Sequence, residues 1–167
     1  MTLKTLDDLF EDTLRDIYYA EKKLVKTLPK MAKKASDKEL AQAFTNHKME
    51  TEGQVARLEK IFEIIGKPAR GKTCDAMDGL VAEGSNIMDE ADNDGVMDAG
   101  LIASAQAVEH YEMARYGTLI AWADQLDLPK ASSLLQETLA EEKAADKLLS
   151  DIAATANPAA QHAEAAE

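Results

Sequence analysis

Apolar residues recur three or four positions apart in four long stretches of this chain, which places them on one face of an α-helix. The four stretches run from about Thr5 to Ala35, Asp37 to Ile65, Gly95 to Leu126 and Pro129 to Ala154. Gly66 ends the second pattern, and Pro129 suits the first position of the fourth. Pro29 lies inside the first pattern, where it is expected to kink or end the helix. The pattern predicts an all-α protein with four long amphipathic helices.

The lengths of the connections predict how these helices are arranged. Only a few residues join the first helix to the second and the third to the fourth, so each pair is expected to form an antiparallel hairpin. Residues 67–94 make a much longer link, with room for a short helix near 75–89. Two hairpins joined by one long crossover form a ferritin-like four-helix bundle. We expect this bundle to occupy residues 1–156 and residues 157–167 to form a disordered tail.

The composition of the chain indicates which kinds of ligand and partner it can bind. The 167 residues include 19 Lys and Arg against 31 Asp and Glu, a formal net charge of −12. This balance argues against a nucleic-acid-binding surface and is compatible with metal cations as ligands. The chain begins without the apolar core of a signal peptide, and its apolar runs are too short to span a bilayer. A single cysteine, Cys74, fits a reducing compartment. We therefore expect a cytoplasmic protein that binds neither nucleic acid nor membranes.

Acidic residues interrupt the apolar stripe of every long helix near its middle. The interrupting residues are Glu21 in the first helix, His47 and Glu50 in the second, Glu109 and Glu112 in the third, and Glu142 and Asp146 in the fourth. Residues three or four apart share a helix face, so all seven could project into one layer of the core. Buried carboxylates are costly unless they are paired or bound to metal. With no inward Lys or Arg to match them, the set predicts two divalent metal ions, with iron, manganese or zinc suited to these ligands.

The spacing within the hairpins supports a shared layer. Glu21 precedes Glu50 by 29 residues and Glu112 precedes Glu142 by 30, so the two hairpins superpose roughly. The correspondence fails at the outer candidates, which predicts that two bound metals would be inequivalent. Any single glutamate on such a stripe has an alternative interpretation, because a shift in helix phase by one residue would leave it in solvent.

Two tyrosines lie within a turn of the proposed layer. Tyr18 and Tyr116 either donate hydrogen bonds to the carboxylates or serve as core aromatics with a tethered hydroxyl.

Four short segments resemble a known family. Residues 19–24 (YAEKKL), 108–112 (VEHYE), 116–119 (YGTL) and 137–143 (ETLAEEK) are similar to the YciE/YciF family of bacterial stress-associated, ferritin-like proteins. The resemblance extends over nearly the whole chain apart from the tail. It implies a homodimer, and more distantly the layout resembles ferritins, bacterioferritins and rubrerythrins.

In those more distant families, a Glu from the first and third helices joins a Glu-x-x-His pair from the second and fourth to hold two irons. The resemblance therefore implies a di-iron site, and a ferroxidase or peroxidase-like oxidoreductase using dioxygen or peroxide. This chain departs from the pattern, because Gly53 and Ala145 stand where the two histidines belong. The alternative is a stress protein that binds metal without turnover, or a dimeric scaffold.

Overall fold

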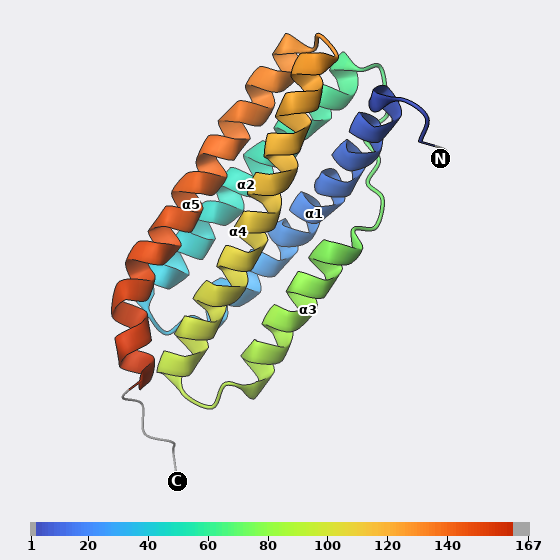
Figure 1. The fold of residues 1–167 in the computed structure, drawn as a ribbon. Helices are drawn as coiled ribbons and strands as arrows, with labels where there is room; N and C mark the ends of the chain where they lie inside the picture. The colour runs from blue at the N-terminus through green and yellow to red at the C-terminus, as the bar shows by residue number, and fades with distance from the viewer. Residues whose placement is uncertain (1–2, 162–167) are drawn as a thin grey trace.

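The computed structural model describes residues 3–161, which form five α-helices and, within that range, no strand (Figure 1). The helices are α1 (Leu6–Lys34), α2 (Lys38–Ile64), α3 (Asp75–Glu90), α4 (Asp94–Gln125) and α5 (Pro129–Gln161). The predicted all-α, ferritin-like bundle is confirmed. The four long helices lie side by side, and the shorter α3 packs outside them against α4 and α1.

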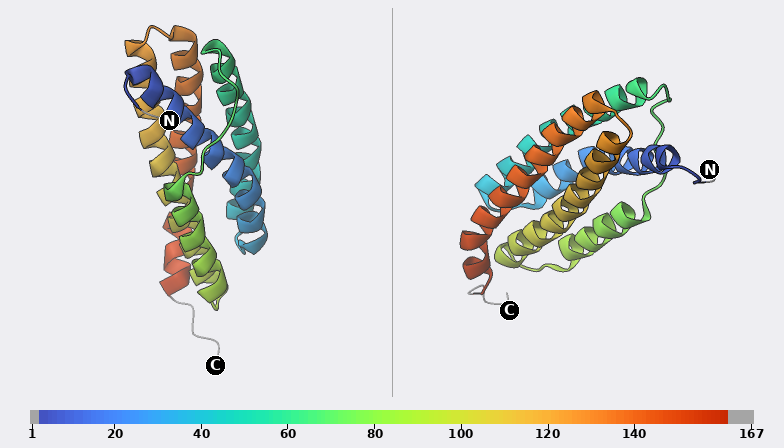
Figure 2. Two further views of the ribbon diagram at one scale, coloured as in Figure 1. Left: turned by 90° about the vertical axis from the view of Figure 1, so that its right-hand side faces the viewer. Right: turned by 45° about the horizontal axis from the view of Figure 1, so that its top comes forward.

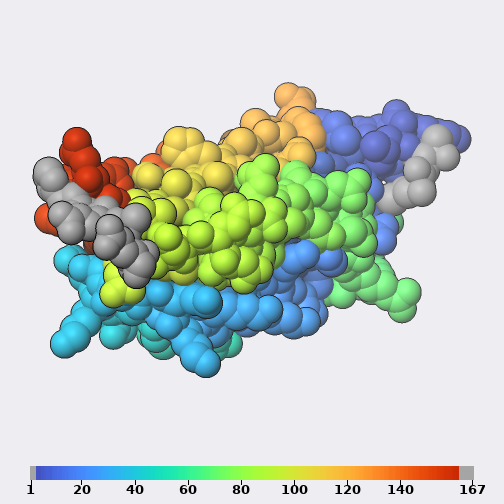
Figure 3. All heavy atoms as spheres, turned by 90° about the horizontal axis from the view of Figure 1, so that it is seen from below, coloured from blue at the N-terminus to red at the C-terminus, as the bar shows by residue number. Residues whose placement is uncertain are grey.

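Two antiparallel hairpins, α1–α2 and α4–α5, make up the bundle (Figures 1 and 2). Helix α1 contacts α2 and α4, and α5 contacts the same two helices, so the four close a ring around one core. The crossover from α2 passes along α1 before α3 begins (Figure 2). The crossover and α3 together return the chain to the end where α2 started, so α2 and α4 run in the same direction (Figure 1). Seen from below, α3 lies over the bundle between α4 and α1 (Figure 3).

Local signals explain where the helices begin and turn. The side chains of Thr5, Asp37 and Asn93 each accept a hydrogen bond from a backbone N–H in the first turn that follows, which satisfies a donor with no partner inside the helix. Gly66, with φ of +68°, provides the left-handed residue that ends the second pattern. Asp98 of α4 accepts from the backbone N–H groups at the α1–α2 turn and so ties the two hairpins together.

One helix is longer than the sequence predicts. Helix α1 matches its predicted length, since it continues through Pro29 to Lys34, but α5 continues through Pro158 to Gln161 rather than ending near Ala154. The alanine-rich end of α5 has high helix propensity and packs on α4: a Cβ placed on Gly95 would lie 3.0 Å from the Cα of Ala160. The rest of the expected tail, residues 162–167, lies outside the described residues.

The core consists of apolar side chains from all four long helices, interrupted by one polar layer. On α1, for example, Ile17 and Leu24 are buried on either side of Glu21, which is also fully buried. The polar layer is therefore enclosed by protein, halfway along the bundle. None of the described helices is apolar over a stretch long enough to cross a membrane.

Candidate metal centre

Five of the seven predicted residues meet inside the bundle, and each of the four long helices contributes at least one. They are Glu21 from α1, His47 from α2, Glu109 and Glu112 from α4, and Glu142 from α5, all at most 7% exposed. The last four can each bring one ligand atom within 4.8 Å of the others. We call these five residues the central cluster.

His47 connects the cluster to the molecular surface. Its Nε2 lies 3.1 Å from Glu109 Oε1 and 3.8 Å from Glu142 Oε2, and its Nδ1 lies 3.3 Å from Glu50 Oε2. Burial alone would lower the pKa of His47, but the Glu109 and Glu50 carboxylates outweigh burial and raise it well above its usual value. The imidazole is the one basic group found in contact with the cluster within residues 3–161.

Most of the carboxylate oxygens in the cluster have no hydrogen-bond partner within residues 3–161. In this described part of the chain, both oxygens of Glu112 and of Glu142, together with one each of Glu21 and Glu109, are buried and unpartnered. Burial raises the pKa of Glu21 to about 8 and those of Glu112 and Glu142 well above the ordinary value. Buried oxygens of this kind normally have a partner. The layer therefore has the acceptor atoms of a cation site, and the described helices provide too few donors to satisfy them.

The two tyrosines differ in what they contact. The hydroxyl of Tyr116 is fully buried and donates to Glu21, as one of the two alternatives predicted. The hydroxyl of Tyr18 instead donates to Glu59, 2.8 Å away and outside the cluster. Only Tyr116 therefore orients a carboxylate of the cluster.

The prediction that Glu50 and Asp146 face the core is wrong. The Glu50 side chain is 50% exposed and reaches the cluster only through His47. Asp146 accepts from Gln106 at 3.0 Å and lies 3.3 Å from His110 Nε2, at the edge between α4 and α5. One residue turns the helix face by about 100°, so a small error in phase is enough to move a side chain from the core to solvent.

A register of 30 residues in both hairpins places Thr51, not Glu50, opposite the position of Glu142. Moving the first hairpin forward by 91 positions then superposes buried residues throughout: Glu21 on Glu112, Phe44 on Leu135, Thr51 on Glu142, Leu58 on Leu149, and Ile61 on Ile152. Thr51 was missed as part of the layer, although the length of the second hairpin pointed to it.

Gln54 also belongs to the polar layer and was not among the predicted site residues. Its side chain is fully buried, and its Nε2 donates to Glu141 Oε2 at 3.1 Å. The amide oxygen, Oε1, is buried and has no hydrogen-bond partner in the part of the chain that the structure describes. Glu141 also pairs with Arg57. Gln54 therefore offers the layer one further neutral acceptor.

A small opening connects the cluster with the surface between α2 and α5. It has a volume of about 150 Å³, and its lining includes His47, Glu109, the exposed Glu50 and the small residues Ala43 and Ala145. Small side chains at the helix interface leave this space unfilled. An ion or a diatomic molecule could therefore reach His47 and Glu109 without crossing the apolar core.

Comparison with known proteins gives consistent matches over most of the chain. The model of a domain of unknown function, DUF892, matches residues 5–163. Protein YciF of Escherichia coli (strain K12) is 45% identical over 154 residues, covering 92% of this chain and 93% of YciF.

Solved structures agree in fold. The crystal structure of the E. coli stress protein YciF superposes with a TM-score of 0.90 at 43% identity, covering 93% of this chain and 99% of that one. YcfI from Rhodopseudomonas palustris, named as a candidate structural protein, matches with a TM-score of 0.87 at 46% identity, covering 88% and 94%. A Xanthomonas campestris protein at 20% identity and a TM-score of 0.72 shares the fold.

Proposed function

The chain belongs to the DUF892 family, which confirms the resemblance to YciF, and we propose that it is a stress-associated protein with a dinuclear metal centre at the central cluster. The unpartnered carboxylate oxygens carry this proposal. Iron is the metal we propose, and oxidation of Fe(II) by dioxygen or peroxide is the reaction.

Charge balance favours two ions rather than one. The four glutamates of the cluster carry four negative charges when ionised, and within residues 3–161 only His47 pairs with any of them. Two divalent cations with a neutral imidazole would neutralise the set in full, whereas one would leave two buried negative charges. Carboxylate oxygens and one imidazole form a ligand set that suits iron and manganese.

The proposed ligands differ from those of the distant di-iron families. Glu21 and Glu112 take the places of the two single glutamates, and Glu142 takes that of the fourth-helix glutamate. Thr51 and Gln54 stand where the second helix would supply its Glu-x-x-His pair. Glu109 and His47 would supply the missing carboxylate and imidazole from neighbouring turns. The proposed site therefore has nearly as many ligands as the distant di-iron sites, but they come from different positions on the helices.

Each residue has a definite task in the proposed reaction. Two Fe(II) ions held there would supply two electrons, which reduce one dioxygen to peroxide or one peroxide to two waters with uptake of two protons. Tyr116 holds Glu21 in place through its hydroxyl. Glu50, bonded to His47 Nδ1, fixes which imidazole nitrogen faces the cluster. The opening beside Ala145 would admit the oxidant.

The second candidate is a stress protein that holds metal without redox turnover. One observation favours it: the cluster contains one imidazole where the distant di-iron families have two. The predicted homodimer belongs to both candidates, and sedimentation of the purified protein tests it.

Metal analysis and aerobic Fe(II) addition distinguish the candidates. We expect about two iron ions per chain after dialysis and ferric absorbance that grows faster than spontaneous oxidation, with both lost in Glu112→Gln. The matched control is Glu52→Gln, which changes an exposed glutamate and should behave as the unmodified protein. Bound iron that oxidises at the spontaneous rate would support the second candidate. A protein that binds neither iron, manganese nor zinc would refute both.

A further inference from the structure

More than half of the positive charges of this acidic protein lie in two segments of the chain. Residues 15–38 of α1 and the first turn, together with residues 67–72 of the crossover, contain 11 of the 19 Lys and Arg residues. The same two segments contain only 3 of the 31 Asp and Glu residues. The crossover lies along α1, so the two basic segments meet in space (Figure 2). The remainder of the chain carries 8 basic against 28 acidic residues.

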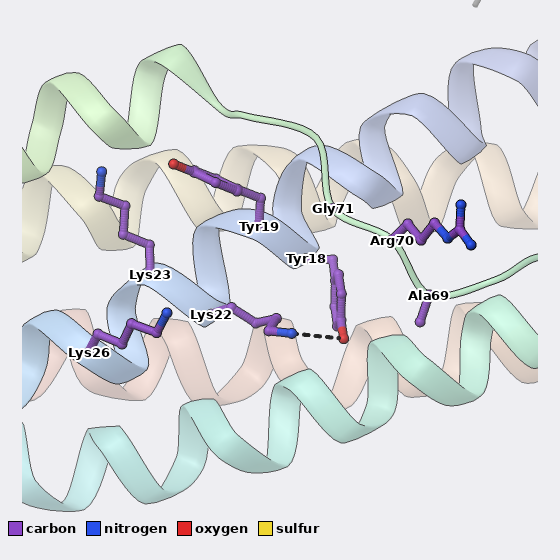
Figure 4. Close-up of a pocket in the computed structure, with 8 residues that line it drawn as sticks. All are labelled: Tyr18, Tyr19, Lys22, Lys23, Lys26, Ala69, Arg70 and Gly71. Atoms are coloured by element: carbon purple, nitrogen blue, oxygen red, sulfur yellow. Dashed lines mark hydrogen bonds between the residues drawn. The ribbon is translucent and has the colours of Figure 1, made fainter.

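A groove of about 730 Å³ lies where these segments meet (Figure 4). Helix α1 supplies Tyr18, Tyr19 and three lysines, and the crossover supplies Ala69, Arg70 and Gly71. Among the described residues, none that lines the groove carries a carboxylate. Its volume falls within the usual range of about 300–1,000 Å³ for small-molecule sites. The groove is therefore both positively charged and large enough for a ligand.

The groove is held open by specific contacts. Arg15 Nε donates to the carbonyl of Arg70 at 3.0 Å, and the backbone N–H of Lys72 donates to the carbonyl of Arg15 at 3.1 Å. A Cβ on Gly71 would lie 3.1 Å from the Cβ of Tyr19, so glycine allows the crossover to approach α1 this closely. These contacts fix one wall of the groove before any ligand binds.

Three of its four cations have no carboxylate partner within the described part of the chain. Lys23 pairs with Asp78, but no carboxylate oxygen in residues 3–161 lies within ion-pair distance of Lys22, Lys26 or Arg70. Lys22 Nζ instead lies 5.0 Å from the centre of the Tyr18 ring and donates to its hydroxyl at 3.4 Å. Figure 4 shows Lys22 and Arg70 on opposite sides of Tyr18. Cations with free donors on both sides of a groove are suited to an oxyanion with several oxygens.

We propose that this groove binds a small polyvalent oxyanion, of the phosphate-ester or pyrophosphate class, independently of the metal centre. A ligand of the groove's size would contact Lys22, Lys26 and Arg70, while the carboxylates beside the groove, Glu59 and Asp78, already accept from the hydroxyls of Tyr18 and Tyr19. An extended polyanion such as nucleic acid would lie against the acidic remainder of the molecule and be repelled by it. The rings of Tyr18 and Tyr19, which line the groove, would accommodate an apolar or planar group attached to the oxyanion.

Calorimetric titration of the full chain with inorganic pyrophosphate, without added metal, tests the proposal. We expect saturable one-to-one binding that weakens as salt rises and weakens at least tenfold in the double variant Lys26→Gln/Arg70→Gln. A second groove, lined by Lys60 and Lys130 but also by Glu63, provides the matched control, Lys60→Gln/Lys130→Gln. This control removes the same charge and should leave binding unchanged.

Three results would overturn the proposal: no saturable binding, equal losses in both double variants, or tighter binding of a single-stranded oligonucleotide than of pyrophosphate through the same residues. Circular dichroism of each variant shows whether it is folded. Failure here would leave the metal centre untouched, because the titration contains no metal and the substituted residues lie outside the cluster.

Discussion

Replacing Glu21 with Gln should make the metal-free protein more stable in alkaline solution, and the magnitude follows from burial of the carboxyl group. Burial raises the pKa of Glu21 to about 8, against 4.5 for an exposed glutamate. Between these two values the folded state holds a proton that the unfolded state has lost. The free energy of unfolding therefore decreases as the pH rises across this window.

The size of the effect is large on the scale of protein stability. The two pKa values differ by about 3.5, and at about 1.4 kcal/mol for each this amounts to roughly 5 kcal/mol. Total stabilities are about 5–15 kcal/mol. Glu112 and Glu142 act in the same direction. His47 also acts in this direction, because its pKa is higher in the folded protein than in the unfolded one. Its contribution to stability is complete below about pH 6.5 and is lost as the pH rises through the pKa of the folded state.

Urea unfolding followed by circular dichroism, with a chelator present, measures this between pH 5.5 and 8.5. We expect the stability of the unmodified protein to fall steeply, and that of Glu21→Gln to fall less and to be the greater of the two at pH 8.5. The glutamine can still accept the hydrogen bond from Tyr116. Glu52→Gln, an exposed change, should follow the unmodified protein. A metal-free protein whose stability is flat over this range, or a Glu21→Gln variant with the same slope, would refute the reasoning.

Three further substitutions test other parts of the structure by urea unfolding. Tyr116→Phe removes the donor to buried Glu21 and should cost about 1–3 kcal/mol at pH 7; an unchanged stability would contradict their hydrogen bond. Asp98→Ala removes the acceptor of two backbone N–H groups, at 2.8 and 2.9 Å, and should cost at least about 2 kcal/mol. Gly100→Ala places a Cβ against a side chain of α3 and should cost about 1–3 kcal/mol. A Cβ on Gly79 meets no atom of residues 3–161 within 4 Å, so Gly79→Ala should instead stabilise by about 1 kcal/mol; equal effects of the two glycine changes would contradict the packing of α3 on α4.

The helices and hairpins could be predicted because each depends on signals that are local in the chain. Period, caps and connection lengths all act over a few residues, and they agree with one another. The end of α5 was predicted wrongly because a contact distant in the chain outweighs the local signal there. Pro158 is a local signal for a break, but contact between Ala160 and Gly95 and the propensity of the surrounding alanines outweigh it.

The central cluster could be predicted in part. Acidic residues near the middle of the apolar face of all four long helices must meet in the core once the helices pack as a bundle. The error at Glu50 came from helix phase, which spacing along one helix fixes only to about a residue. Comparison of the two hairpins at a register of 30 would have pointed to Thr51. The basic groove could not be predicted from the sequence. One of its walls depends on hydrogen bonds that join Arg15 to Arg70 and Lys72, which lie at least 55 positions later in the chain.

The absence of any lysine or arginine paired with the buried glutamates, within residues 3–161, makes their neutralising charge exchangeable. A fixed cation would have closed the layer permanently. Here acid would fill it with protons, and metal would displace those protons as the solution becomes more alkaline, releasing them to the medium. The interior of the bundle would thus act as a small ion exchanger, able to discharge its metal in mild acid while the surrounding fold stays intact.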